Sequence, residues 1–340
     1  MNKNRKLVAF AERGDRPHVV VFDLELRRRR KVLRCAEFVS QEVISLAFSH
    51  DSKYLLAQGG APDFSLVYFF WEKNKVITTL KNMSTIRNPI AQVSFHPKDR
   101  SVVCIVGQGI FKMCRLTEGV LKQFGFQKAE HHSMVCHDWI GARHVLIGTK
   151  VGKILIMEDA ELKTSVDIIT LIDNSNVSLS SMSEAEVSDS KHGCTNPEMR
   201  EISAMISFKG GFICSLGSGR AVVVDTIINK DSDEDVKLKV SQIIKLPLRN
   251  ANTAGTWTSA QTASGSKIIA MALNVSETVL IALTDTLQLM SFALKSNKGK
   301  VSFLGVAALW IDCMFFPADQ EGVTVVTNSQ TLIRVYLGLR

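Results

Sequence analysis

Apolar residues in this chain gather in short runs that are separated by polar turns rich in Gly, Asp, Asn and Ser. A clear group begins with two runs over residues 43–57, continues through 66–72 and closes with 76–80. Short apolar runs of this kind, without a helical period, predict β-strands. The pattern therefore predicts an all-β chain.

This group of four predicted strands recurs along the sequence. Phe48 and Phe95 occupy equivalent positions 47 residues apart, and Trp139 follows 44 residues later. A period of roughly 40–47 residues with four strands per unit is typical of β-propeller blades. The first two strands of each unit are almost continuously apolar, as expected for strands covered on both faces. A β-sandwich, the structural alternative, would alternate apolar and polar positions more cleanly.

We therefore predict a WD-repeat type β-propeller over residues 1–340, with about seven four-stranded blades of which the first and last are incomplete. The first blade is expected to lack its inner strand and the last its outer strand, so that unpaired edges remain. Such edges favour aggregation or capture of another chain. The approximate blades are 3–34, 41–82, 89–126, 132–170, 201–247, 267–306 and 309–340, with inserted loops at 171–200 and 248–266.

The positive charge of the chain is concentrated at one end. Residues 1–34 hold eleven of the 41 Lys and Arg residues and only four of the 33 Asp and Glu residues, which accounts for +7 of the net +8. A nucleic-acid-binding protein would spread its basic surface more widely or interleave it with aromatic residues, so no specific nucleic acid is expected. The basic run is the one candidate binding patch, placed in a turn between outer strands: Arg27, Arg28, Arg29, Arg30 and Lys31. It is either a solvated turn or a surface for an acidic partner.

The pattern of cysteines and the hydropathy of the chain indicate the cellular compartment in which the protein is expected. The seven cysteines are scattered and contain no C-x-x-C pair, so neither a disulfide framework nor a zinc knuckle is indicated. The longest apolar run, residues 305–316, is interrupted by Asp312 and is too short to span a bilayer. We expect a protein of the cytoplasm or cytoskeleton, with no membrane partner.

Candidate chemistry is sparse. The one group that resembles metal ligands is His131 and His132 followed by Cys136, His137 and Asp138. Neighbouring residues of a strand point to opposite faces, so Cys136 and His137 would not share an ion, and we expect neither metal nor cofactor. No nucleophile elbow, H-E-x-x-H pair or phosphate loop is present in the sequence. We expect no enzyme; a propeller hydrolase with a convergent acid–base group in its channel is the alternative.

Several segments resemble a known family. Residues 48–57 are similar to the first hairpin of a WD repeat, and Trp71-Glu72 stands where such repeats carry a Trp-Asp pair. The segments 51–58 and 118–123 resemble, more specifically, WD-repeat proteins of cilia and flagella. The similarity covers nearly the whole chain and is strongest over residues 33–158.

The resemblance implies a non-catalytic interaction scaffold in the axoneme of a motile cilium or flagellum, similar to a factor for assembly of inner dynein arms. It implies protein partners such as components of dynein arms or of their regulatory complex, and tubulin. Members of the family carry a second propeller and a coiled coil, which this chain lacks, so we expect an isoform, a partial gene model or a fragment. The alternative from the binding class is a cytosolic WD-repeat adaptor unrelated to cilia.

Overall fold

The computed structural model describes residues 1–11, 17–36, 38–81, 84–125, 131–175, 200–217, 219–228, 236–245, 267–286 and 288–294, and the backbone of four later strands. Secondary structure in these ranges is almost entirely strand, which confirms the all-β class. The chain forms two compact units. Unit 1 comprises Met1–Val145, Met157–Lys163 and Leu309–Arg340; unit 2 comprises Leu146–Ile156 and Thr164–Ala308. The expected insert 248–266 and most of the insert 171–200 lie outside the described residues.

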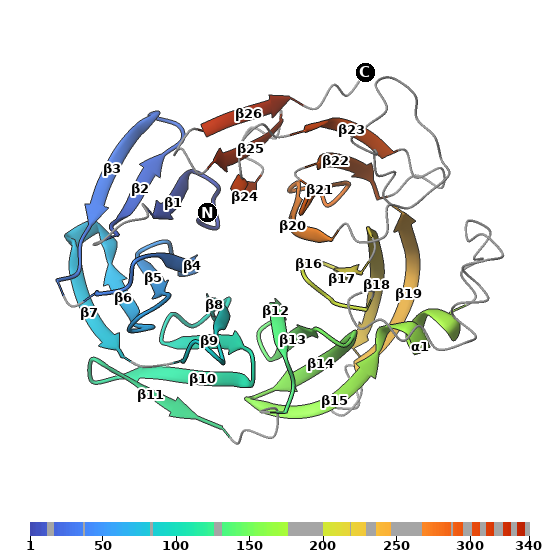
Figure 1. The fold of residues 1–340 in the computed structure, drawn as a ribbon, viewed down its shortest axis with the longest axis horizontal. Helices are drawn as coiled ribbons and strands as arrows, with labels where there is room; N and C mark the ends of the chain where they lie inside the picture. The colour runs from blue at the N-terminus through green and yellow to red at the C-terminus, as the bar shows by residue number, and fades with distance from the viewer. Residues whose placement is uncertain are drawn as a thin grey trace. The chain divides into compact units, whose positions relative to one another are not determined.

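The described strands pair in antiparallel sheets that follow the order of the chain (Figure 1). The first three sheets are β1 (Leu7–Ala11), β2 (Val19–Asp23) and β3 (Arg28–Leu33); β4 (Val43–Phe48), β5 (Tyr54–Gly59), β6 (Leu66–Phe70) and β7 (Lys75–Leu80); and β8 (Ile90–Phe95), β9 (Val102–Gly107), β10 (Ile110–Thr117) and β11 (Val120–Phe124).

The remaining sheets continue the same pattern. They are β12 (Met134–Ile140), β13 (His144–Thr149), β14 (Lys153–Glu158) and β15 (Glu161–Asp167); β16 (Met205–Phe208), β17 (Gly211–Leu216), β18 (Arg220–Ile228) and β19 (Val236–Lys245); β20 (Ile268–Leu273), β21 (Val279–Thr284), β22 (Gln288–Ala293) and β23 (Val301–Val306); and β24 (Ile311–Phe315), β25 (Gly322–Thr327) and β26 (Leu332–Tyr336). In the described part of the chain, the sheets between the first and the last have four strands each, and those two have three.

The packing of neighbouring sheets in unit 1 explains why their middle strands are apolar throughout. Leu55 and Ala57 of β5 pack in a cluster with residues of the first sheet, whereas Leu56, between them, packs in a cluster with residues of the third sheet. Successive side chains of a strand point to opposite faces, so a strand covered on both faces has no position left for a polar residue. All six residues of β9 are buried for the same reason.

The first sheet matches the second, third and fourth strands of its neighbours. β1 lies beside β4, as β5 lies beside β8, and the first strands β4, β8 and β12 lie next to one another (Figure 1). β1 therefore occupies the place of a second strand. The position of a first strand in this sheet is not filled by any strand of the described residues.

Two short helices differ from the sequence prediction. The strand expected to continue to residue 72 ends at Phe70, and Trp71–Lys73 form a 3-10 helix, η1, that closes on Asn74 in the left-handed region (φ 51°). Residues 171–173, predicted to begin an inserted loop, belong to helix α1 (Ile168–Asp173). The side chain of Asp167 accepts hydrogen bonds from the backbone N–H of Ile169 and Thr170, an N-cap that starts the helix where β15 ends.

Candidate protein-binding surface

The basic run lies on strand β3 rather than in a turn. The turn between β2 and β3 ends at Arg27, whose φ of 50° is left-handed, and Arg28, Arg29, Arg30 and Lys31 form the first four residues of β3. The prediction that the whole run occupies the turn is therefore wrong. The reason is the shortness of the turn: strand pairing resumes immediately after it, with Arg28 opposite Asp23.

Asp23 is the residue that sets this turn. Its Oδ1 accepts hydrogen bonds from the backbone N–H of Glu25 at 3.0 Å and of Leu26 at 2.9 Å. An aspartate side chain that accepts from the backbone two or three residues later is a standard means of stabilising a tight turn. A β-bulge follows, because Lys31 pairs with Val21 while Arg29 pairs with Phe22. Arg30 is thus the extra residue, and the bulge adds local twist to the edge of the sheet.

The basic run has little counter-charge. All five side chains are exposed, and Leu26 beside them is exposed as well. The nearby acid Glu25 is bound to Lys6 at 2.8 Å, and the mostly buried Asp23 reaches Arg30 only at 3.8 Å. Within the described residues, the remaining cations of the run have no acidic partner. Four cationic residues in succession on an edge strand also discourage unspecific strand pairing, since like charges repel an approaching edge.

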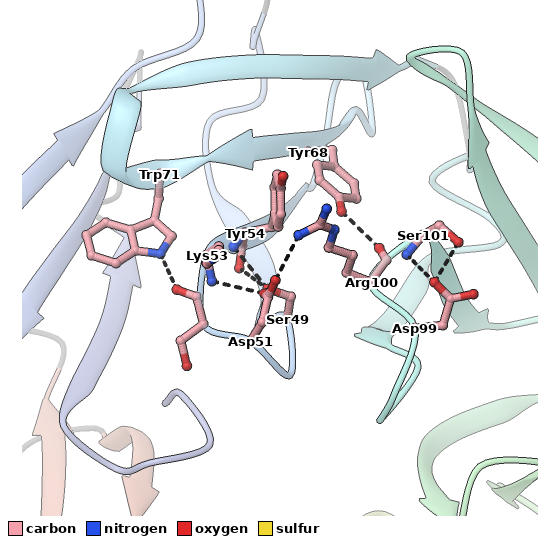
Figure 2. A network of polar contacts seen from close by, with 10 residues as sticks. Ser49, Asp51, Lys53, Tyr54, Tyr68, Trp71, Asp99, Arg100 and Ser101 are labelled. Carbon is pink, nitrogen blue, oxygen red and sulfur yellow. Dashed lines mark hydrogen bonds and ion pairs between the residues drawn. The ribbon is translucent and has the colours of Figure 1, made fainter.

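A second polar cluster, which the sequence analysis missed, joins the hairpins of two neighbouring sheets (Figure 2). Asp51, in the β4–β5 hairpin, accepts hydrogen bonds from Ser49 Oγ at 2.6 Å and the Lys53 backbone N–H at 3.1 Å. Its other oxygen pairs with Arg100 Nη1, from the β8–β9 hairpin, at 3.1 Å. Partial burial opposes ionisation of Asp51, but these hydrogen bonds outweigh it and hold the pKa of Asp51 below its ordinary value.

Arg100 and Tyr68 hold the same two sheets together. The guanidinium of Arg100 lies over the ring of Tyr54, 4.9 Å from the ring centroid. The backbone carbonyl of Arg100 accepts a hydrogen bond from Tyr68 Oη at 2.9 Å. Figure 2 shows the guanidinium of Arg100 beside the ring of Tyr54, with a dashed line from it to Asp51. Burial raises the pKa of Tyr68, so its phenol keeps the proton that it donates.

The chain of hydrogen bonds continues to the N-terminal segment on one side and to the β12–β13 hairpin on the other. Asn2 Nδ2 donates to Ser52 Oγ at 3.1 Å, and His96 Nε2 lies 2.6 Å from the carbonyl oxygen of Ala142, in the β12–β13 hairpin. Four successive segments of unit 1 are thus fixed to one another at this end of their sheets. Loops held on a rigid scaffold in this way are suited to binding, because little order has to be gained when a partner docks.

The histidine-containing segment that resembled metal ligands is part of β12. Cys136 and His137 are both buried, and His137 Nε2 lies 2.6 Å from Ser94 Oγ of β8. Among the described residues, no group of three His, Cys, Asp or Glu side chains is placed to hold a metal ion. Burial lowers the pKa of His137 to about 3, so its ring is neutral near pH 7. In the same part of the chain, no helix is long and apolar enough to cross a membrane.

Comparisons with known proteins agree with this architecture. No family model matches the chain. It is 32% identical over 346 aligned residues to "Cilia- and flagella-associated protein 57" of Mus musculus, which covers 95% of this chain and 26% of that protein. It is 24% identical over 210 residues to "Cilia- and flagella-associated protein 43" of Chlamydomonas reinhardtii, 48% of this chain and 12% of that protein. The resemblance to WD-repeat proteins of cilia and flagella is confirmed, and the chain spans about a quarter of the mouse relative.

A solved structure shows the fold. The chain resembles the β-propeller domain of Myceliophteria thermophila Cps50 (Swd1), with a TM-score of 0.71 and 13% sequence identity, covering 99% of this chain and 94% of that one. The fold is therefore a β-propeller, as the repeat predicted.

Proposed function

We propose that this chain is a non-catalytic protein-binding module of the axoneme of motile cilia or flagella. The observation that carries the proposal is the similarity to the mouse ciliary protein over 95% of the chain. The second relative, which covers about half of the chain, also bears a cilia- and flagella-associated name. A cytosolic adaptor unrelated to cilia has no comparable support, since both named relatives are ciliary. The proposal includes a role in the assembly of inner dynein arms. It also includes a propeller of seven blades, of which the first and last are incomplete.

The basic run on β3 is the surface through which this module would bind an acidic partner. Its side chains, Arg27 to Lys31, are exposed, and the nearest acids are engaged by Lys6 or by the turn itself. A compact group of exposed positive charges attracts and orients acidic surfaces. The acidic tails of tubulin and acidic neighbours in the axoneme fit this chemistry. The partner is thus proposed to be recognised by charge, with affinity that falls as salt is raised.

Replacement of all five residues of the basic run by glutamine is expected to weaken binding to microtubules about tenfold or more at low ionic strength. Five exposed charges at about 0.3–0.5 kcal/mol each account for a change of this size. The measurement is co-sedimentation of the purified chain with taxol-stabilised microtubules over a range of tubulin concentrations. Microtubules whose acidic tails have been removed by protease should bind the wild-type chain as weakly as intact microtubules bind the variant.

The matched control removes the same charge elsewhere. Exposed lysines outside the basic run and outside the second polar cluster are replaced by glutamine: Lys122, Lys150, Lys153, Lys237 and Lys239. This variant should bind within about twofold of the wild type. Equal binding by the wild-type chain and the variant of the basic run would show that this run is not the binding surface.

A further inference from the structure

Exposed cations gather where the first hairpins of the second and third sheets meet. Asn2 donates a hydrogen bond to Ser52, and this bond brings the chain next to Lys3 close to the chain next to Lys53. Arg100, bound to Asp51, brings the β8–β9 hairpin alongside, together with Lys98. These side chains come from three segments that are far apart in the sequence. We call residues 49–53, residues 96–101 and Lys3 the hairpin rim.

The side chain of Arg100 is fixed by contacts with its neighbours but remains accessible to a ligand. This side chain is 49% exposed although it pairs with Asp51 and lies over Tyr54. A guanidinium has five N–H donors, and one of them is used in a side-chain hydrogen bond within the described residues. A cation whose position is fixed, but whose other donors are accessible to solvent, loses little conformational freedom when it binds a carboxylate.

The acids of the hairpin rim are occupied within it. Asp51 accepts hydrogen bonds from Ser49, the Lys53 backbone N–H and Arg100. Asp99 accepts from both the backbone N–H and the hydroxyl of Ser101, and these bonds hold the pKa of Asp99 below its ordinary value. The carboxylates are half-buried in these contacts, while Lys3, Lys53, Lys98 and Arg100 are exposed. The rim therefore offers cationic donors to a partner.

We propose that the hairpin rim is a docking surface, separate from the basic run on β3, for an acidic peptide segment of a partner protein. Arg100 would receive a carboxylate of that segment, and the exposed Lys53 and Lys98 of the same two hairpins would add positive charge. The arrangement favours a peptide over a nucleic acid, because Arg100 covers one face of the Tyr54 ring and tilted contacts with Tyr68 and Phe70 enclose it further. Stacking of bases needs an open aromatic face.

The test uses Lys3, Lys53 and Lys98, whose side chains form no hydrogen bond or ion pair within the described residues. The full chain with its basic run already replaced by glutamine serves as the parent, so that the surface on β3 does not contribute. Binding of a fluorescein-labelled oligoglutamate peptide is measured by fluorescence anisotropy at low ionic strength. Replacement of Lys3, Lys53 and Lys98 by glutamine in this parent is expected to raise Kd about tenfold, as the loss of three exposed charge contacts implies.

A control variant of the same parent replaces Lys122, Lys237 and Lys239, on the outer strands β11 and β19. It should leave Kd within about twofold, and both variants should melt at the temperature of the parent. Equal Kd values for the rim variant and the control would overturn the proposal. So would tighter binding of a single-stranded oligonucleotide of the same charge. Failure of the basic run in microtubule co-sedimentation is a separate result, obtained with different variants, and leaves this test unchanged.

Discussion

Replacement of Tyr68 by alanine is expected to lower the free energy of unfolding by about 4 kcal/mol, because large-to-small changes of a fully buried aromatic residue cost about 3–5 kcal/mol. Tyr68 has no exposed surface, and its ring makes an edge contact with Phe95 of the next sheet at a centroid distance of 5.3 Å. The substitution therefore opens a cavity in the cluster between two sheets and also removes the hydrogen bond to the Arg100 carbonyl.

Replacement of Tyr68 by phenylalanine is the matched control. It keeps the ring and removes only the hydroxyl that donates to Arg100, so a loss of about 1 kcal/mol is expected. Urea unfolding followed by circular dichroism and by tryptophan fluorescence measures both variants. A loss below about 1 kcal/mol for the alanine variant would contradict the packing described for this cluster.

The second large effect is a loss of stability on mild acidification that depends on His137. Its ring is fully buried against Ser94, and burial lowers its pKa to about 3. Below pH 6.5 the unfolded chain takes up a proton on this residue while the folded chain does not, so the folded state loses stability as pH falls from about 6.5 toward 3. Between pH 7 and pH 5 this residue alone should cost about 2 kcal/mol.

Urea unfolding at pH 7 and pH 5 measures the effect in the wild-type chain and in His137→Gln. Glutamine does not titrate, so the variant should lack the part of the pH dependence that His137 contributes, even where its stability at pH 7 is lower. The quantity compared is the change in the free energy of unfolding between pH 7 and pH 5, and this change is measured within each protein. Equal pH dependence in both proteins would show that His137 accepts its proton normally in the folded state.

Much of the fold could be predicted because strand patterns repeat. The spacing of Phe48, Phe95 and Trp139 marks the ends of the first strands, and in the structure these residues lie in β4, β8 and β12. The continuous apolar runs were informative for a physical reason, since a strand such as β9 is covered by a sheet on each face. The helix α1 was missed because six residues are too few to show a helical period.

The basic run on β3 and the hairpin rim differ in how readily they can be identified from the sequence. The basic run on β3 is contiguous and is found by counting charges, although its placement on the strand depends on the hydrogen bonds of Asp23. The hairpin rim is assembled from Lys3 and two later segments, residues 49–53 and 96–101. Each of these two segments holds charges of both signs, and the net charge beyond residue 34 is close to zero. A charge count therefore does not detect it.

A signal for the hairpin rim was nevertheless present. Counted from Phe48 and Phe95, Lys53 and Arg100 stand at the same position of successive repeats. A cation that recurs with the blade period is placed at the same end of adjacent sheets. What the period does not predict is that Asp51 of one hairpin pairs with Arg100 of the next, since this depends on how closely the two sheets pack.

The central claim, that this chain is an axonemal binding module, is tested most directly by binding to isolated axonemes. Purified chain is sedimented with demembranated axonemes over a range of axoneme concentrations, beside variants with the basic run, the hairpin rim or the five control lysines replaced by glutamine. We predict saturable binding of the wild-type and control proteins, and weaker binding when the basic run is neutralised. A wild-type chain that stays in the supernatant at every axoneme concentration would contradict the claim.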